Sequence, residues 1–198
     1  MKIAGYLLNT KAGLAGEPGL FYNYILAENG LFVEANSPLL EARVCVADAL
    51  VRGLLPLEEK VNLHKGKIHR YIYDLALSLL YLDPVPGHGV DPVPGHVVDP
   101  YHERYLAITW DGEYHLRMPK QENSEGSVKY EVLPDTLLDI HSHGTLGAFF
   151  STKDNEDERG LRLYMVVGKL DTLVPEVEMR RGVYGYFKSI NIKEVFDV

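Results

Sequence analysis

The sequence contains a single cysteine, Cys45, among its 198 residues. One cysteine cannot form a disulfide within the chain, which excludes a small fold held together by disulfides. Charged and polar residues interrupt every apolar run well before the roughly 20 residues that a membrane-spanning helix needs. Near the start, Asn9, Lys11 and Gly13 break the apolar stretch before the core of a signal peptide forms. We therefore expect a cytoplasmic protein without a membrane segment.

Basic residues are also in the minority, with 20 lysines and arginines against 28 aspartates and glutamates and a formal net charge of −8. No cluster of lysine and arginine offsets this charge, so we do not expect nucleic acid as the main partner. Hydrophobic residues make up 46% of the chain and charged residues 24%, as is ordinary for a globular protein. A chain of this length can bury one substantial core, or the core of a catalytic domain with a small extension.

Two histidines and an aspartate in the second half have the composition and spacing of a three-ligand metal site. His141 and His143 are separated by one residue, and Asp154 follows after ten more. Residues 137–143 alternate between apolar and polar types as a strand does, which places both imidazoles and Asp139 on one face. The two imidazoles are therefore predicted to converge on one point.

The residues between the histidines and the aspartate predict how the carboxylate returns to them. Residues 144–147 are typical of a turn, and Ser151 is expected to cap a helix whose third position is Asp154. Imidazole nitrogen and carboxylate oxygen suit Zn²⁺, and three protein ligands leave the fourth tetrahedral position for water, as in catalytic sites. We therefore predict one zinc ion per chain.

Each of these features also has an explanation without a metal. A solvated strand can carry two alternating histidines, a capping box needs no ligand, and the acidic residues in 154–158 suit any helix N-terminus. The combination favours the metal site, because Gly144 follows the second histidine and an apolar pair at 149–150 precedes the serine.

Residues 141–144, together with Phe149, Ser151 and Asp154, resemble the signature of the JAB/MPN/JAMM metalloprotease family. In that signature His-x-His is followed after ten residues by Asp, with a serine three residues before the Asp. The resemblance covers residues 66–187 and implies an α/β fold with a curved mixed sheet flanked by helices, in a sandwich similar to that of cytidine deaminases. It also implies a zinc-dependent peptidase or isopeptidase that acts after the C-terminal tail of a ubiquitin-like protein.

The resemblance also implies catalytic roles. The family needs an upstream glutamate at the start of a strand as general base and then acid, and Glu103 fits best, at the start of a strand predicted over 103–110. Glu113, at the start of the following strand, is the alternative. Ser151 would donate a hydrogen bond to the developing oxyanion of the substrate. Asp139 is either an acceptor for an imidazole N–H or a carboxylate at the end of the strand.

Some family members carry a long insertion after the aspartate that recognises a linked ubiquitin chain. Here Gly160 is expected to end the helix, and an apolar strand over 161–167 follows at once, which leaves little room for such an insertion. This argues against chain-linkage specificity. A looser likeness, over residues 139–171, extends to the bacterial subfamily called PRTRC system protein A.

Residues 1–64 predict a small β-rich N-terminal extension, with a hairpin that turns at Asn29-Gly30. Within it, residues 38–55 are compatible with either a helix or a strand. Residues 65–198 predict the JAMM-type catalytic domain. It begins with a buried helix over 67–82, whose apolar residues recur at helical spacing. The stripe comprises Ile68, Ile72, Leu75 and Leu79, and it is widened by Tyr71, Leu77 and Leu80.

The sequence Asp-Pro-Val-Pro-Gly-His occurs twice, at 83–88 and 91–96. Proline and glycine at this density predict an extended loop, which leads directly to Glu103 and could form a rim beside the site. His88 and His96 are candidates for a second metal site, but a flexible loop gives poor ligand geometry. We do not expect a second metal site there.

The predicted function is a zinc metallopeptidase that hydrolyses a peptide or isopeptide bond after the tail of a ubiquitin-like protein. The tail is expected to bind in a narrow groove beside the zinc, as an added strand. Two alternatives stay open: a non-catalytic scaffold of the same fold within a protein complex, and a zinc hydrolase of a small molecule. Scaffold relatives typically lack the zinc ligands, whereas all three are present here. A deaminase would need His/Cys/Cys ligands, which one cysteine cannot supply.

Overall fold

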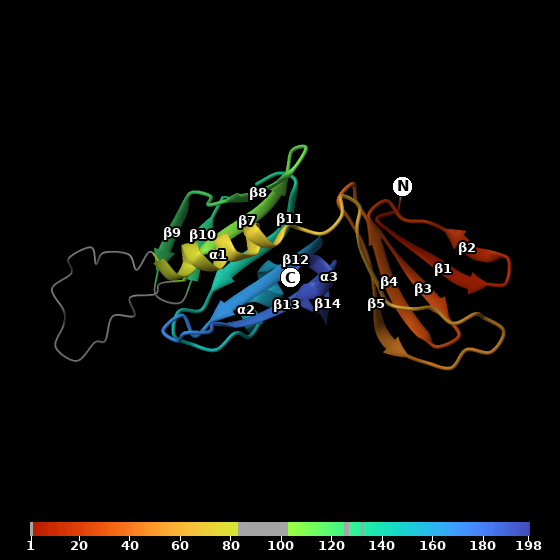
Figure 1. The fold of residues 1–198 in the computed structure, drawn as a ribbon. Coiled ribbons are helices and arrows are strands. Elements are labelled where there is room, and N and C mark those ends of the chain that lie inside the picture. Colours follow the sequence, from red (N-terminus) through yellow and green to blue (C-terminus); the bar gives the residue numbers. More distant parts are fainter. Residues whose placement is uncertain (1, 83–102, 125–126, 132) are drawn as a thin grey trace. The chain divides into compact units, whose positions relative to one another are not determined.

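The computed structural model describes residues 2–82, 103–124, 127–131 and 133–198 (Figure 1). Over these residues the chain is α/β, with two six-stranded mixed sheets, a two-stranded sheet and three helices. The predicted α/β class is confirmed at this level. Both copies of Asp-Pro-Val-Pro-Gly-His, and with them His88 and His96, lie outside the described residues.

The chain divides into two compact units, each formed by segments that are distant in the sequence. Unit 1 comprises Met1–Gly66, Thr152–Arg162 and Arg180–Ile190. Unit 2 comprises Lys67–Ser151, Leu163–Met179 and Asn191–Val198.

The first six-stranded sheet has the strand order β2-β1-β3-β4-β5-β6. Its strands are β1 (Ala4–Thr10), β2 (Gly13–Glu17), β3 (Tyr22–Ala27), β4 (Gly30–Asn36), β5 (Leu40–Asp48) and β6 (Lys60–Leu63). Strands β1 and β3 are parallel, and the other neighbours are antiparallel. The predicted hairpin is confirmed, because β3 and β4 pair with Ala27 opposite Gly30. Residues 38–55, for which the sequence leaves helix and strand open, contain strand β5 and no helix.

Alternation along these strands gives the first sheet two apolar faces. One face carries a cluster of Leu7, Ile25, Ala27 and Phe32, with Cys45 and Leu57 packed against it. On the other face Tyr24 donates or accepts a hydrogen bond with the hydroxyl of Tyr186, over 3.0 Å. Tyr22 stacks on Tyr184 with 4.7 Å between ring centroids. Unit 1 therefore has packing on both faces of its sheet.

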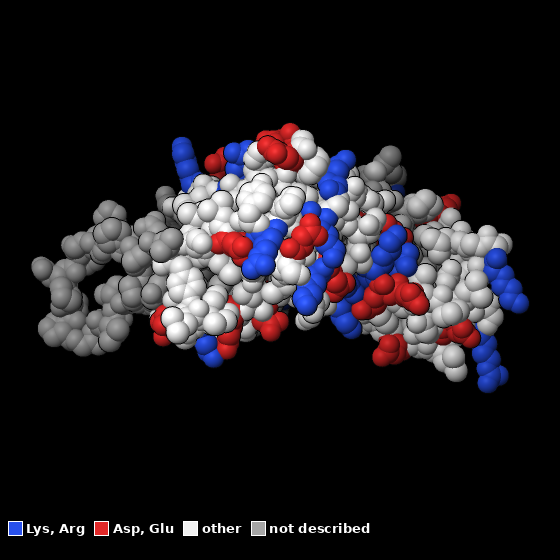
Figure 2. Space-filling model, in the orientation of Figure 1, with Lys and Arg blue, Asp and Glu red and all other residues white. Residues whose placement is uncertain are grey.

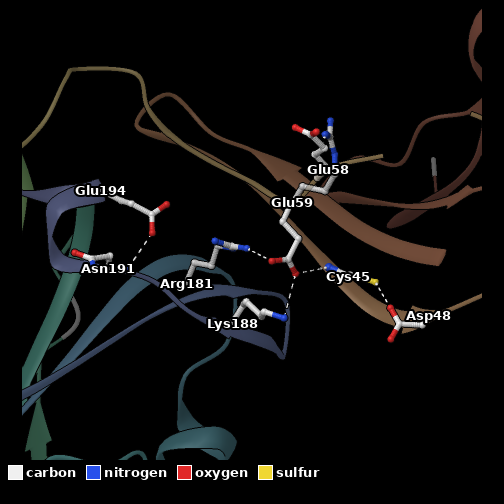
Figure 3. Close-up of polar contacts among 9 residues, drawn as sticks. Cys45, Asp48, Glu58, Glu59, Arg181, Lys188, Asn191 and Glu194 are labelled. Atoms are coloured by element: carbon white, nitrogen blue, oxygen red, sulfur yellow. Dashed lines mark hydrogen bonds and ion pairs between the residues drawn. The ribbon is translucent and has the colours of Figure 1, made fainter. Parts of the chain in front are cut away.

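Glu59 joins the first sheet to the later part of unit 1 (Figure 3). Its carboxylate accepts hydrogen bonds from the Arg181 guanidinium at 2.8 Å and from the Cys45 N–H at 3.0 Å. Lys188 lies 3.6 Å from the same carboxylate. Burial raises the pKa of the Cys45 thiol, so this thiol is held in its neutral form.

The second six-stranded sheet has the order β14-β13-β12-β11-β7-β8. Its strands are β7 (Tyr105–Trp110), β8 (Tyr114–Arg117), β11 (Thr136–Ser142), β12 (Leu161–Gly168), β13 (Glu176–Val183) and β14 (Tyr186–Ser189). Strand β11 runs parallel to β12 and antiparallel to β7. Strands β9 (Gln121–Ser124) and β10 (Ser127–Tyr130) form the two-stranded sheet.

The helices are α1 (Arg70–Leu82), α2 (Thr152–Asp157) and α3 (Ile192–Val195). Helix α1 lies against the second sheet beside β8 (Figure 1), and the Arg104 guanidinium donates to the Leu79 carbonyl at 3.3 Å. Its buried residues are Ile72, Ala76 and Leu80, whereas Leu75 is 45% exposed. The predicted helix is confirmed, and Ile72 and Leu80 are buried as predicted. Leu75 and Tyr71 were also expected in the buried stripe but are exposed, and Ala76 is buried instead.

Candidate metal centre

Strand β11 presents the two histidines from inside the second sheet. Every residue of β11 except His141 is buried, and the strand lies inside the sheet between β7 and β12. His143 follows the strand directly, and its N–H donates to the Val167 carbonyl at 2.9 Å, which continues the pairing with β12. Both histidines therefore have a backbone position fixed by the sheet.

The side chains of these histidines converge as the alternation predicts. Their Nε2 atoms lie 3.2 Å apart, and one ligand atom each from His141, His143 and Asp154 lies within 4.8 Å of the other two. His143 is buried, while His141 and Asp154 are partly exposed. The three residues predicted as metal ligands are thus brought together, and the group can bind a metal ion.

The distance between the two nitrogens tests whether zinc fits. Two imidazole nitrogens on a tetrahedral Zn²⁺, each at about 2.05 Å, would be about 3.3 Å apart. The separation of Nε2 in His141 and Nε2 in His143 is 3.2 Å, which agrees with this value. Two nitrogens and a carboxylate oxygen are also a donor set that zinc prefers.

Two phenylalanines pack against the ligand imidazoles. The Phe149 ring meets His143 with 4.7 Å between centroids and a 66° interplanar angle. Phe150 meets His141 in a similar edge-on arrangement at 6.3 Å. These contacts restrict rotation of the two imidazoles and place apolar surface beside the site. The apolar pair before the serine therefore contributes to the site itself.

The turn after His143 is held close to β12. The Leu170 N–H donates to the Gly144 carbonyl at 2.9 Å, and Gly144 adopts a positive φ of 57°. A Cβ atom on Gly168 would lie 2.4 Å from backbone atoms of residues 146–148. Only glycine at position 168 permits this approach.

Glu176 also contacts the turn after His143. Its carboxylate is ion-paired with Lys169 and accepts a hydrogen bond from the Ala148 N–H at 3.3 Å. The hydrogen bond from Lys169, followed by that from Ala148, lowers the pKa of the Glu176 carboxyl. The carboxylate is therefore ionised at neutral pH and can accept the hydrogen bond from the Ala148 N–H.

Glu103 lies just before β7, at the end of the sheet where β11 carries His141. His141 lies opposite Tyr105, and Ser142 exchanges hydrogen bonds with Arg104, over 2.9 Å from its N–H and 3.0 Å to its hydroxyl. Glu103 is partly exposed and lies two residues before β7.

Glu113 lies beyond the other end of β7. The strand that separates it from Glu103 is roughly 17 Å long. Its side chain is 78% exposed and lies 3.8 Å from the His115 imidazole. Of the two glutamates considered for the general base, the sheet brings only Glu103 to the end of β11 where the histidines lie.

Asp139 is buried below His141 on the same face of β11, and the Tyr105 hydroxyl donates a hydrogen bond to its carboxylate. Tyr105 is itself opposite His141. The sequence alone does not reveal this role of Tyr105, because it depends on the register between β7 and β11. Ser151 is partly exposed and directly precedes α2, three residues before Asp154, as predicted.

Charges of both signs are interspersed on the face of the molecule that Figure 2 shows. Among the described residues on that face, neither sign forms a continuous area (Figure 2). This face lacks the basic stripe typical of nucleic-acid binding. No helix within the described ranges is both long enough and apolar enough to cross a membrane.

No family model, curated protein or solved structure significantly matches the chain.

Proposed function

We propose that the chain is a zinc-dependent metallopeptidase of the JAB/MPN/JAMM type. It would hydrolyse a peptide or isopeptide bond after the C-terminal tail of a ubiquitin-like protein. The observation that carries the proposal is the convergence of His141, His143 and Asp154, whose ligand atoms lie within 4.8 Å of one another. The spacing of these residues along the chain is the spacing of the family signature.

The surroundings of the ligands support a catalytic rather than a structural site. Three protein ligands leave one tetrahedral position open, and two of the three residues are partly exposed, so a substrate could reach them. We also propose that the second sheet, with α1 on its face, is the curved sheet flanked by helices of this family. The position of the ligand strand inside the sheet and the ligand helix after it support this assignment.

The proposed chemistry divides among three kinds of group: a metal ion with its ligands, a general base and a hydrogen-bond donor. A zinc ion held by His141, His143 and Asp154 would lower the pKa of water and polarise the scissile carbonyl. Glu103 would accept the proton of the attacking water and then deliver it to the leaving amine, a role typically worth 10²–10⁴-fold in rate. The Ser151 hydroxyl would donate a hydrogen bond to the developing oxyanion of the substrate, worth about 3 kcal/mol.

The flexible tail of a ubiquitin-like protein suits the proposed substrate site for a physical reason. An extended tail can bind by adding main-chain hydrogen bonds to an exposed strand, which requires no preformed deep pocket. The net charge of −8 suits a basic partner surface.

The test combines metal content with activity. Protein purified without added metal or affinity tag is analysed for zinc, beside a variant that carries both His141→Ala and His143→Ala. Both proteins are then incubated with ubiquitin-like proteins that carry a C-terminal extension. About one zinc per chain and cleavage after the tail, both lost in the variant, are expected.

Other results would favour the alternatives. Zinc without cleavage of any fusion, combined with hydrolysis of small amides, would indicate a small-molecule hydrolase. Absence of zinc even after reconstitution would contradict the peptidase and leave the scaffold.

A further inference from the structure

Helix α2 carries the ligand Asp154 but has no buried residue of its own. A helix of six residues is too short to be stable in isolation, because nucleation costs more than so few hydrogen bonds return. Without an apolar face, α2 also lacks the packing that normally holds a surface helix. Its position must therefore be fixed by polar contacts.

Arg180 of β13 provides such contacts from inside unit 1. Its Nε and Nη2 atoms donate to Oε2 of Glu158 at 2.9 and 2.5 Å, and its Nη1 atom donates to Oδ1 of Asn155 at 2.6 Å. The guanidinium also lies 3.9 Å from the centre of the Phe187 ring, stacked over its face. Arg180 and Glu158 are both more than nine-tenths buried.

These contacts hold the chain after Asp154 at two residues, Asn155 and Glu158. Asn155 is the residue after Asp154, and the Glu158 N–H donates to the Asp154 carbonyl at 2.9 Å. The planar guanidinium fixes the direction of each hydrogen bond, which a lysine ammonium cannot do. A shift of α2 would break several charge-assisted bonds in a buried place, where each is costly to lose.

We infer that Arg180 is a positioning residue for the metal centre: it holds α2 so that the carboxylate of Asp154 points to the two histidines. This inference rests on the proposed metal site. Partners that orient metal ligands typically contribute 10–100-fold to metal affinity. Arg180 is therefore expected to contribute to zinc affinity without touching the metal.

The next residue on the same strand supplies a matched control. Arg181 is also buried, but it points to the opposite face of β13, where it donates to Glu59 at 2.8 Å (Figure 3). Both arginines are buried and form an ion pair with a glutamate in unit 1, although the side chain of Glu59 is 30% exposed and that of Glu158 is 8% exposed. Only the pair of Arg180 involves the segment that carries Asp154. Arg181→Lys tests the general effect of weakening such a pair.

The experiment measures two quantities for wild type, Arg180→Lys, Arg181→Lys and Asn155→Ala. The dissociation constant for Zn²⁺ is obtained by competition with a chelator, and thermal unfolding is followed on the metal-free proteins. Arg180→Lys is expected to weaken zinc binding 10–100-fold. Arg181→Lys is expected to lower the Tm while zinc affinity stays within about twofold of wild type, because its ion pair lies apart from α2.

Asn155→Ala keeps the inference testable if Arg180→Lys does not fold. Asn155 is exposed, and alanine is the better helix former, so this variant should fold and its α2 should be intrinsically more stable. A weakening of zinc binding of about threefold or more would then reflect the lost contact with Arg180.

The possible results separate this inference from the proposed function. If Arg180→Lys binds zinc as tightly as wild type, the positioning role of Arg180 is wrong and the metal site stands. Asn155→Ala provides the same test where Arg180→Lys does not fold. If Arg180→Lys and Arg181→Lys weakened zinc binding equally, the positioning role would also be overturned, because both substitutions would then act through the general stability of the fold. A wild-type protein that binds no zinc would overturn the proposed function and this inference together.

Discussion

The Nε2 atoms of His141 and His143 lie 3.2 Å apart, although His141 lies in β11 and His143 is two residues further along the chain, directly after the strand. Alternate residues of a strand are about 6.6 Å apart along its axis, so the two rings must tilt toward each other to meet. The ring centroids lie 5.0 Å apart, and the angle between the ring planes is 48°. The sheet and the two phenylalanines thus maintain an arrangement in which both nitrogens face the same point.

A first prediction concerns stability. A metal that binds only the folded chain stabilises it by RT ln(1 + [L]/Kd), about 4 kcal/mol when free zinc is 1,000 times Kd. The Tm of the zinc-loaded protein is expected to exceed that of the chelator-treated protein by roughly 8 °C. Differential scanning calorimetry measures this shift. The double variant of His141 and His143 to alanine should show no shift, and an equal shift in that variant would place the metal elsewhere.

A second prediction separates the two glutamates considered for the general base. Glu103→Gln removes the group that accepts a proton but preserves shape, so cleavage is expected to slow 10²–10⁴-fold while zinc content stays at the wild-type level. Glu113→Gln, at the other end of β7, should stay within about twofold of wild type. Initial rates on a ubiquitin-like fusion measure both effects. A large loss in Glu113→Gln with an active Glu103→Gln would reverse the assignment.

A third prediction concerns the turn after the histidines. Gly168→Ala would place a Cβ atom 2.4 Å from the backbone of residues 146–148, so the turn must move. Overpacking of this kind costs about 1–3 kcal/mol of unfolding free energy. Chemical denaturation measures that cost, and weaker zinc binding should accompany it, because the turn leads to the Phe149 ring on His143.

Gly147→Ala is the control for this change. The nearest atom to its added Cβ would be Oε2 of Glu176 at 3.0 Å, which is the movable end of a side chain. A cost well below that of Gly168→Ala is therefore expected. Equal costs for the two variants would contradict the proposed clash with the backbone.

The predictable part of the candidate site is the part that depends on local sequence. The alternation of residues 137–143 predicts β11, and the serine at position 151 predicts the start of α2, because strand period and helix capping act over a few residues. The three ligands follow from these two elements and their spacing. The site could therefore be anticipated without knowledge of the sheet order.

The missed features depend on contacts between distant residues. Arg180 and Glu158 are 22 positions apart, and no local pattern marks either as buried. Tyr105 reaches Asp139 only through the register of β7 and β11. In α1 the spacing of apolar residues predicts the helix, but Leu75 is exposed and Ala76 is buried. The packing of the helix on the sheet selects the buried face, and hydrophobicity alone does not.

A fourth prediction concerns pH and unit 1. The hydrogen bond from Lys60 to Glu41, over 2.6 Å, lowers the pKa of the Glu41 carboxyl. A carboxyl whose pKa is lower in the folded state stabilises the fold above its unfolded pKa, and this contribution disappears as pH falls through the folded value. Lys60 is 42% exposed, so solvent screens the pair and its contribution should be about 0.5–1 kcal/mol at pH 7.

The difference in unfolding free energy between wild type and Glu41→Gln should therefore be present at pH 7 and should vanish in acid, below the folded pKa. Urea denaturation of the metal-free proteins across this pH range measures it, since removing zinc avoids the titration of its ligands. Glu17→Gln is the control, because the pair of Glu17 with Lys2 is 80% and 66% exposed and should contribute little at any pH. A difference for Glu41→Gln that persists in acid would show that the carboxylate charge is not its cause, since the carboxyl would be neutral in both folded and unfolded chains.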